Sequence, residues 1–495
     1  MMPIIGATAG EEPLLGTAGM WVIGFYLLAL IGIGLVGRMA RQENSMSDFF
    51  LGGRNLGFIV LLLTLYATQY SGNTLIGFAA KAYRSGFTFL VALPFMMGII
   101  GMYLIFAPRL QRLSRKYNFI TLGDYVQHRF NHRGLTTLIA VSGIIALCNF
   151  LVTNLKAMGE MAFLVTGGLL SEGQGIVLLA IVILIYETLG GLRSVAWTDV
   201  LQGVLLVVGC TIIFVATLVN LGGISGAAEQ LHEVRPDFWE APGFKQCLGW
   251  VSTAMIVSIG LALYPHAIQR IYAARSPRTL KRSLQVMVFF PLITTLLMVT
   301  IGVLGNIAYP GLSNDSSEGI TLLVLKDFAM THPAAGWVTI VFVAAVFAAI
   351  MSTADSALLA IASSATQDLL RPLTNIDDQH RLTLLGKVIS TSVMAIAVIF
   401  ASNLPASIWQ LIQIKTELLA QTAPALLCGL YFRQLNARAV LTGFLVGTAF
   451  TLFFLVGNYF APDSIAHKPF GVHAGLWGVI LNFGLIWWIG RRTTD

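Results

Sequence analysis

Polar side chains gather in two otherwise apolar stretches, and their types suit the binding of a small dehydrated cation. The first stretch is YATQYSGNTLIG at residues 66–77, and the second is AAIMSTADSALL at residues 348–359. Hydroxyl groups and freed backbone carbonyls are the oxygen ligands that a hard cation prefers. Together the stretches predict an ion site, while the alternative is that small and hydroxyl residues only let helices pack closely.

The second stretch also predicts which side chains face the site. Ala349, Ser352, Thr353 and Ser356 recur at i, i+3, i+4 and i+7, so they share one face of a helix. Asp355 lies on an adjoining stripe. Because a carboxylate at membrane depth costs roughly 2.5 to 3.5 kcal/mol, it should face a cation, a proton or a polar partner on another helix.

Composition places these stretches in a membrane. The chain has 495 residues, of which 56% are hydrophobic and 11% charged, against about 25% charged in a soluble domain. The four cysteines form no CxxC pair, so neither a disulfide framework nor a zinc site is indicated. The net charge of +7 is interpreted as a topology signal, and no nucleic-acid partner is expected.

Hydropathy predicts how the chain is threaded. A bilayer core needs about 20 mostly apolar residues per helix. We therefore expect an all-α membrane protein with 13 transmembrane helices, at roughly 18–37, 57–81, 85–108, 134–165, 174–190, 194–221, 246–270, 283–309, 336–365, 384–402, 405–432, 437–459 and 472–490. The segments between them are too short to form a catalytic domain, so an enzyme is not expected.

Charge asymmetry predicts the orientation. With the N-terminus outside, 22 of the 30 Lys and Arg residues fall in cytoplasmic loops, among them Arg270. We expect a multi-pass protein of the bacterial plasma membrane with an external N-terminus and a cytoplasmic C-terminus. The first helix is interpreted as retained, because no A-x-A cleavage site accompanies it.

Several motifs in order give a family resemblance. These are the lead-in DFFLGGRNLG, AT-x-x-SG in the second helix, SVAWTDVLQG opening the sixth, ALYPHAIQRIYAA closing the seventh and AAIMST in the ninth. The chain resembles the solute:sodium symporter family, which implies a leucine-transporter fold with a 5+5 inverted repeat. The implied divisions are 1–56, the first repeat at 57–221, the second at 222–432, and two C-terminal helices in 433–495. The seventh helix, with Gly260 and Pro265, would be interrupted like the second.

The resemblance also implies two ion positions. The main Na⁺ site would use oxygens of Ala67, Tyr70, Ala349, Ser352 and Thr353. A second position in some members would use the residues matching Asp199 and Ser356, but Asp355 stands where a hydroxyl is expected. Since two carboxylates in one pocket repel each other, this position could hold a second Na⁺ or a proton.

The solute determinants depart from the proline-transporter pattern. Gln69 replaces an acidic residue, Asn73 replaces an aromatic one, and Val257 and Leu261 stand where aromatics are found. The expected solute-binding residues are Gln69, Ser71, Gly72, Asn73, Asn154, Val257, Leu261 and Gln421. Lys415 would attract a substrate carboxylate if unpaired, whereas pairing with a glutamate would make it structural.

The function implied is Na⁺-coupled symport of a small organic solute into the cytoplasm by alternating access. Amino acids other than proline, pantothenate-like acids and other carboxylates are the solutes considered, and a monomer in the lipid bilayer is expected. Two alternatives stay open: a proton-coupled symporter, and a transporter-like nutrient sensor read by a partner.

Overall fold

The computed structural model describes residues 13–331, 335–374, 376–403, 415–432, 434–461, 466 and 468–492. Within these ranges the regular elements are helices, and the only strand-like pairing is an isolated bridge between Leu56 and Ala274. Ten described helical segments are long and apolar enough to span a membrane, and Phe58–Gln69 and Ala474–Gly490 are shorter apolar helices. The all-α membrane class is confirmed, while the count of 13 helices and the division into two repeats of five stay predictions.

The helices follow the predicted apolar segments closely. Their bounds are α1 Thr17–Met39, α2 Met46–Leu51, α3 Phe58–Gln69, α4 Phe78–Ser85, α5 Ala92–Tyr117, α6 Leu122–Phe130, α7 Arg133–Val165, α8 Glu172–Gly190, α9 Leu192–Asn220, α10 Gly223–Val234, α11 Phe244–Leu261, α12 Pro265–Ala273, α13 Pro277–Met287, α14 Phe290–Ile293, α15 Thr295–Ala308, α16 Asn314–Ser317, α17 Ile320–Thr331, α18 Ala335–Ser364, α19 Arg371–Thr374, α20 Gln379–Ala401, α22 Ala423–Tyr431, α23 Ala437–Phe460 and α24 Ala474–Arg492. Short 3₁₀ or π turns, η1 to η6, join several of them.

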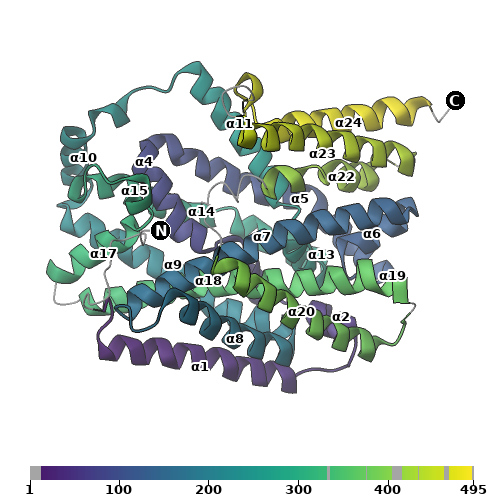
Figure 1. Ribbon diagram of the computed structural model, residues 1–495, viewed down its shortest axis with the longest axis horizontal. Helices are drawn as coiled ribbons and strands as arrows, with labels where there is room; N and C mark the ends of the chain where they lie inside the picture. Colours follow the sequence, from purple (N-terminus) through teal and green to yellow (C-terminus); the bar gives the residue numbers. More distant parts are fainter. Residues whose placement is uncertain are drawn as a thin grey trace.

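The two ends of the bundle carry different connecting segments. The long helices run lengthwise, with α10 and α17 at one end and α2, α6 and α19 at the opposite end (Figure 1). The first pair lies in segments predicted to be external, and the second group in or beside segments predicted to be cytoplasmic. This separation is what alternating passes through a membrane require. Which end faces the cytoplasm stays a prediction.

Helix α18 forms the centre of the bundle. In its most apolar window 78% of the residues are buried, compared with 28% in α1 and α20. It packs against α9, α7 and α3. The polar residues predicted on its face therefore meet protein rather than lipid, as their cost in hydrocarbon requires.

Some helix ends differ from the prediction. The segment predicted to end at residue 365 continues through the π-helical turn η5, Ala365–Leu370, into α19. Asp368 in this turn is buried, and Thr121 donates a hydrogen bond to its carboxylate at 2.5 Å. Thr121 and Asp124, from a distant segment, form hydrogen bonds with the polar side chains of this turn. Hydropathy averaged over neighbouring residues cannot detect such partners.

Close packing of α4 on α15 gives a first test of the fold. An alanine Cβ at Gly302 would lie 2.7 Å from the Ala79 carbonyl carbon, so backbone would have to move. We expect Gly302→Ala to destabilise the protein by about 1 to 3 kcal/mol, measured by thermal unfolding in detergent. Gly101→Ala on α5 is the control, because its Cβ meets nothing within 4 Å. Equal melting temperatures for both variants would contradict the close approach of α4 to α15.

Candidate functional site

The second predicted membrane segment is interrupted where its polar residues cluster. Helix α3 ends at Gln69, and Tyr70 takes an extended conformation with φ −106° and ψ 97°. A π-helical turn, Asn73–Gly77, then leads into α4. The predicted break in YATQYSGNTLIG is therefore present, and it separates α3 from α4.

The seventh predicted segment is interrupted in the same way. Helix α11 ends at Leu261, and α12 begins with Pro265 at its first turn, where a missing N–H costs nothing. Gly260 lies against the backbone of Thr416, whose carbonyl carbon would be 3.0 Å from an added Cβ. Both breaks expected from the resemblance are found.

Helices α3 and α18 meet through oxygen atoms of the predicted main ion site. The Ser352 hydroxyl donates to the carbonyl oxygen of Ala67 at 3.1 Å, and it lies 3.2 Å from that of Ala349. The Thr353 hydroxyl donates to the Ala349 carbonyl at 2.9 Å. All four residues are buried. Tyr70 lies at the break itself, and no hydrogen bond joins it to α18 among the described residues.

These hydrogen bonds use the oxygens of the predicted main ion site. A hydroxyl has one proton and two lone pairs, so it can rotate its proton away and turn a lone pair toward an ion. The carbonyls of Ala67 and Ala349 accept hydrogen bonds from hydroxyls in this structure, and carbonyl oxygens of this kind can also coordinate a hard cation. Four of the five predicted ligands are thus linked by short contacts that run from Ala67 through Ser352 to Ala349 and Thr353.

The predicted second position contains an arginine. Asp199 on α9 and Ser356 on α18 are joined by Arg270 on α12, whose Nη2 lies 3.1 Å from Asp199 Oδ2 and donates to the Ser356 hydroxyl. Arg270 Nε donates to Thr64 Oγ1 at 2.9 Å, and Thr64 donates to Asp199 Oδ2 at 2.5 Å. Arg270 and Asp199 are both fully buried.

Asp355 lies next to this cluster with different partners. Tyr186 on α8 donates to its Oδ2 at 2.5 Å, and the Ser356 hydroxyl is 3.0 Å from its Oδ1. No ion pair to Asp355 occurs in the described part of the chain. The two aspartates, predicted to share one pocket, therefore have different partners. Asp199 pairs with Arg270, whereas Asp355 lies beside the hydroxyls of Tyr186 and Ser356.

Arg270 is a site residue that the sequence prediction misplaced. We counted it with the cytoplasmic loop charges, but it lies inside α12 and is fully buried. Without Arg270, most Lys and Arg residues still fall in the loops predicted to be cytoplasmic. A signal was available: Arg270 follows Pro265 within one short helix and is flanked by Ile268 and Ile271, a pattern of a buried rather than a loop residue.

A small central cavity lies beside the two breaks. The predicted residues Gln69, Ser71, Val257 and Leu261 line it, and the full lining is Thr68, Gln69, Ser71, Thr74, Phe78, Phe95, Met96, Phe150, Val257, Leu261, Tyr264, His266 and Lys415. Its volume is about 50 Å³, room for only a few water molecules. This volume is far below the roughly 300 to 1,000 Å³ of the cavities that usually hold small-molecule ligands.

Three predicted solute residues lie elsewhere. Gly72 lines a neighbouring cavity with Glu160. Asn154 donates to the Phe150 carbonyl of its own helix at 2.8 Å. Gln421 donates to Thr451 at 3.1 Å and to the Gly475 carbonyl at 2.9 Å, so it holds α23 and α24 in place. The side chain of Asn73 lies outside the described residues.

Lys415 is buried in the cavity wall, and no acidic side chain of the described residues pairs with it. It is 2% exposed, and its Nζ lies 3.9 Å from the ring centre of Phe150 and 6.0 Å from that of Tyr264. Nζ has no hydrogen-bond partner among the described residues. Glu417 instead pairs with His473 at 2.9 Å and accepts from the Gly475 N–H at 2.6 Å. The structural alternative, in which a nearby glutamate pairs with Lys415, does not hold for Glu417.

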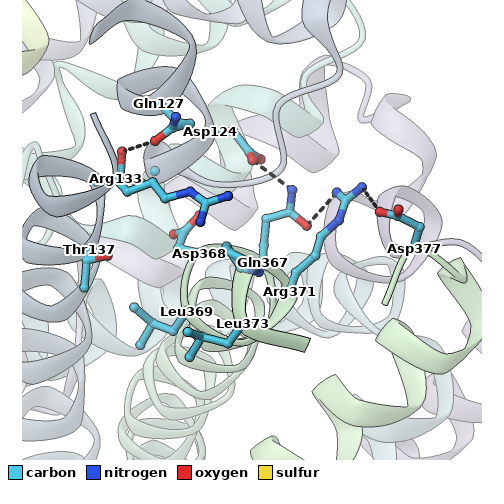
Figure 2. Close-up of a pocket in the computed structure, with 13 residues that line it drawn as sticks. Asp124, Gln127, Arg133, Thr137, Gln367, Asp368, Leu369, Arg371, Leu373 and Asp377 are labelled. Atoms are coloured by element: carbon cyan, nitrogen blue, oxygen red, sulfur yellow. Dashed lines mark hydrogen bonds and ion pairs between the residues drawn. The ribbon is translucent and has the colours of Figure 1, made fainter. Parts of the chain in front are cut away.

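A larger polar cavity opens at the end of the bundle formed by α6 and α19. Figure 2 shows Gln367 between Asp124 and Arg371, which in turn pairs with Asp377 at 3.0 Å. Its volume is about 510 Å³. It shares no lining residue with the central cavity, so it is not part of the predicted ion and solute sites.

Comparison with known proteins agrees with this geometry. The model of the sodium:solute symporter family matches residues 49–447. The osmoregulated proline transporter OpuE of Bacillus subtilis is 28% identical over 450 residues, covering 88% of each chain. The sodium/pantothenate symporter of Escherichia coli is 27% identical over 433 residues, covering 85% of this chain and 87% of the relative.

Solved structures give the same fold. A Na⁺-coupled sialic acid symporter in an outward-open state superposes with a TM-score of 0.79 at 19% identity, over 96% of this chain and 98% of that one. MhsT in complex with L-phenylalanine gives a TM-score of 0.55 at 15% identity, over 87% of this chain and 98% of that one.

The family and these relatives are transporters rather than enzymes, and sodium is the coupling ion that the family name and the relatives indicate. Because the family match covers most of the chain, including both breaks and α18, the chain belongs to the sodium:solute symporter family.

Proposed function

We propose that this protein imports a small organic solute with a carboxylate group, driven by Na⁺ and alternating access. The observation that carries the proposal is the meeting of the α3 break with α18, at the 3.1 Å contact between Ser352 and Ala67. The same break contributes Gln69 and Ser71 to the central cavity. An ion bound on one side of the break would therefore order the backbone that the solute contacts on the other.

The proposed ion site has a composition that favours Na⁺. Its ligands would be the carbonyl oxygens of Ala67, Tyr70 and Ala349 and the hydroxyls of Ser352 and Thr353. Hard oxygen ligands without formal charge suit a monovalent cation that must later be released. Since coupling is reciprocal, solute should raise Na⁺ affinity by the factor by which Na⁺ raises solute affinity.

The solute class is proposed from the cavity wall. The ammonium of Lys415 is buried there without an acidic partner among the described residues, which favours an anionic group on the solute. The named solutes of the relatives, proline and pantothenate, each carry a carboxylate. Phe95, Phe150 and Tyr264 would contact the apolar part of the solute.

The transport cycle uses the two interrupted helices. In this proposal α3–α4 and α11–α12 are the first helices of two inverted repeats, at 57–221 and 222–432. Na⁺ from outside stabilises the arrangement of α3 against α18, solute fills the cavity, and the bundle rocks to open toward α6 and α19. One positive charge moving down 100 mV supplies about 2.3 kcal/mol, enough for about fiftyfold accumulation of a zwitterionic solute.

One observation favours a proton-coupled variant as the second candidate. Asp355 is fully buried and accepts a hydrogen bond from the Tyr186 hydroxyl, with no ion pair among the described residues. A buried carboxylate without a cation is a suitable proton carrier. Uptake that is driven by an inward proton gradient in Na⁺-free buffer, and that Asp355→Asn abolishes, would establish this variant over Na⁺ coupling.

The function is tested with the purified full-length protein. We expect pantothenate or another small carboxylic acid to raise its melting temperature in NaCl but not in choline chloride. The acid that does so should then accumulate in proteoliposomes only under an inward Na⁺ gradient. It should also exchange in counterflow, which a sensor that only binds its ligand would not do. Equal stabilisation and uptake in the two salts would contradict Na⁺ coupling.

A further inference from the structure

We propose that the larger polar cavity is a second binding site, which takes a small aliphatic amino acid in its zwitterionic form. We call this cavity, whose wall includes Asp124, Arg133, Gln367, Asp368 and Arg371, the end cavity. Its binding groups are the Asp368 carboxylate and the Arg133 guanidinium, and Figure 2 shows both in the cavity wall. The inference is independent of the proposed function, because the end cavity shares no lining residue with the central cavity.

The end cavity has the size and the wall of a small-molecule site. Its volume of about 510 Å³ falls within the roughly 300 to 1,000 Å³ of cavities that usually hold such ligands. Leu369, Pro372 and Leu373 give it an apolar wall in addition to its charged groups. A ligand with charged groups and a short apolar side chain therefore suits it. Because the cavity lies at the end of the bundle predicted to be cytoplasmic, its ligand would come from the cytoplasm.

Asp368 provides a buried carboxylate that lacks a charged partner. The residue is only 6% exposed. Thr121 donates to its Oδ1, whereas Oδ2 accepts no hydrogen bond from any residue that the structure describes. The carboxylate lies against Gly123, where an added Cβ would be 2.4 Å from its Cγ. Since a buried carboxylate with a single neutral donor is costly, it favours a positively charged group in the cavity beside it.

Arg133 provides the opposite charge from another element. It lies in the first turn of α7, its side chain is exposed, and it lines the same cavity as Asp368. Within the described ranges its guanidinium forms no hydrogen bond or ion pair. The planar fork of N–H donors on a guanidinium matches the two oxygens of a carboxylate. Because Arg133 and Asp368 do not pair with each other, a ligand can lie between them.

The other charged groups of the end cavity already have partners. Asp124 accepts from the Gln367 side chain at 2.8 Å and from two backbone N–H groups at 2.6 and 3.1 Å. Arg371 pairs with Asp377 at 3.0 Å. One carboxylate and one guanidinium are left in the wall without a charged partner among the described residues. A ligand with both an ammonium and a carboxylate is matched by the two groups, whereas a simple anion or cation is matched by only one.

The test measures L-valine binding to the purified full-length protein by isothermal titration calorimetry. Choline chloride replaces NaCl, so that Na⁺-dependent binding in the central cavity does not contribute. We expect one saturable site per molecule. Isovalerate, which is valine without its ammonium, and isobutylamine, which is valine without its carboxylate, should each bind about 10- to 100-fold more weakly, because each loses one charge-assisted contact.

Matched variants assign the binding to the two charged groups. Arg133→Gln and Asp368→Asn should each weaken valine binding about 10- to 100-fold. Arg133→Gln changes an exposed side chain, so we expect its melting temperature to equal that of the unmodified protein. Arg381→Gln is the control, because Arg381 is an exposed arginine that does not line the cavity, and valine binding should stay unchanged.

Three results would overturn the inference. One is the absence of saturable valine binding in choline chloride, which would leave Na⁺-coupled transport intact. Another is isovalerate binding as tightly as valine, which would show a simple anion site. The third is valine binding that Lys415→Met abolishes and Arg133→Gln preserves, which would place valine in the central cavity. If Asp368→Asn does not fold, Arg133→Gln and the two valine analogues still decide.

Discussion

Replacing Ser352 with alanine is expected to weaken Na⁺ binding about 10- to 100-fold. The hydroxyl is a proposed ligand, and it is also the group that joins α18 to the Ala67 carbonyl on α3. A hydrogen bond or ligand contact to a charged group contributes about 1.5 to 3 kcal/mol, and each 1.4 kcal/mol is tenfold in affinity. The readout is ²²Na⁺ affinity without solute, followed by the Na⁺ dependence of uptake.

Two comparisons make the Ser352 result specific. Thr353→Ala should lower Na⁺ affinity by a similar factor, but it removes no described hydrogen bond between helices, since Thr353 donates to Ala349 of its own helix. Ser364→Ala removes a buried hydroxyl elsewhere on α18 and should leave Na⁺ affinity unchanged. Na⁺ affinity in Ser352→Ala equal to that in Ser364→Ala would contradict the site assignment.

The interruptions and the ion face were predictable from sequence because they depend on local residue types. Seven consecutive polar or small residues from Thr68 to Thr74 cannot all face lipid, so an apolar segment that contains them must bend around a protein interior. The i, i+3, i+4 spacing of Ala349, Ser352 and Thr353 fixes one helix face regardless of the rest of the fold. The structure then brings these two local features together.

The partners of the charged residues were not predictable, because they come from distant segments. Arg270 was assigned to a loop since the hydropathy of α12 alone is low, and its burial depends on Asp199, Thr64 and Ser356 from three other helices. A single sequence does not show which acid and base meet. The positive-inside rule counts arginines without distinguishing an exposed one from one that is paired inside the bundle.

Two amide side chains in the solute prediction also have partners that the sequence does not show. Asn154 and Gln421 are predicted solute residues because each lies among other polar residues of an apolar segment. In the structure those partners are backbone carbonyls and Thr451, which makes them packing residues. For Lys415 the sequence offers a partner that the structure does not use. Glu417 is only two residues away, but residues at i and i+2 of a helix do not face each other.

Replacing Lys415 with methionine is expected to separate solute binding from ion binding and from stability. The variant removes a desolvated ammonium and keeps a flexible apolar side chain of similar length, so we expect a higher melting temperature. Solute affinity at saturating Na⁺ should fall about 10- to 100-fold, because a charge-assisted hydrogen bond to the carboxylate is lost. The ²²Na⁺ affinity without solute should stay close to that of the unmodified protein.

The decisive measurement compares an acid with its uncharged analogue. In the unmodified protein, the carboxylate that binds should be preferred over its amide by about the same factor, and in Lys415→Met this preference should vanish. Lys387→Met is a matched control, since Lys387 also lies over an aromatic ring, 5.1 Å from that of Phe49, but outside the cavity. A preference for the acid that survives in Lys415→Met would show that another group holds the carboxylate. Loss of the preference would show that Lys415 pairs with the carboxylate of the solute. A higher melting temperature in the same variant would show that the buried ammonium lowers stability when no solute is bound.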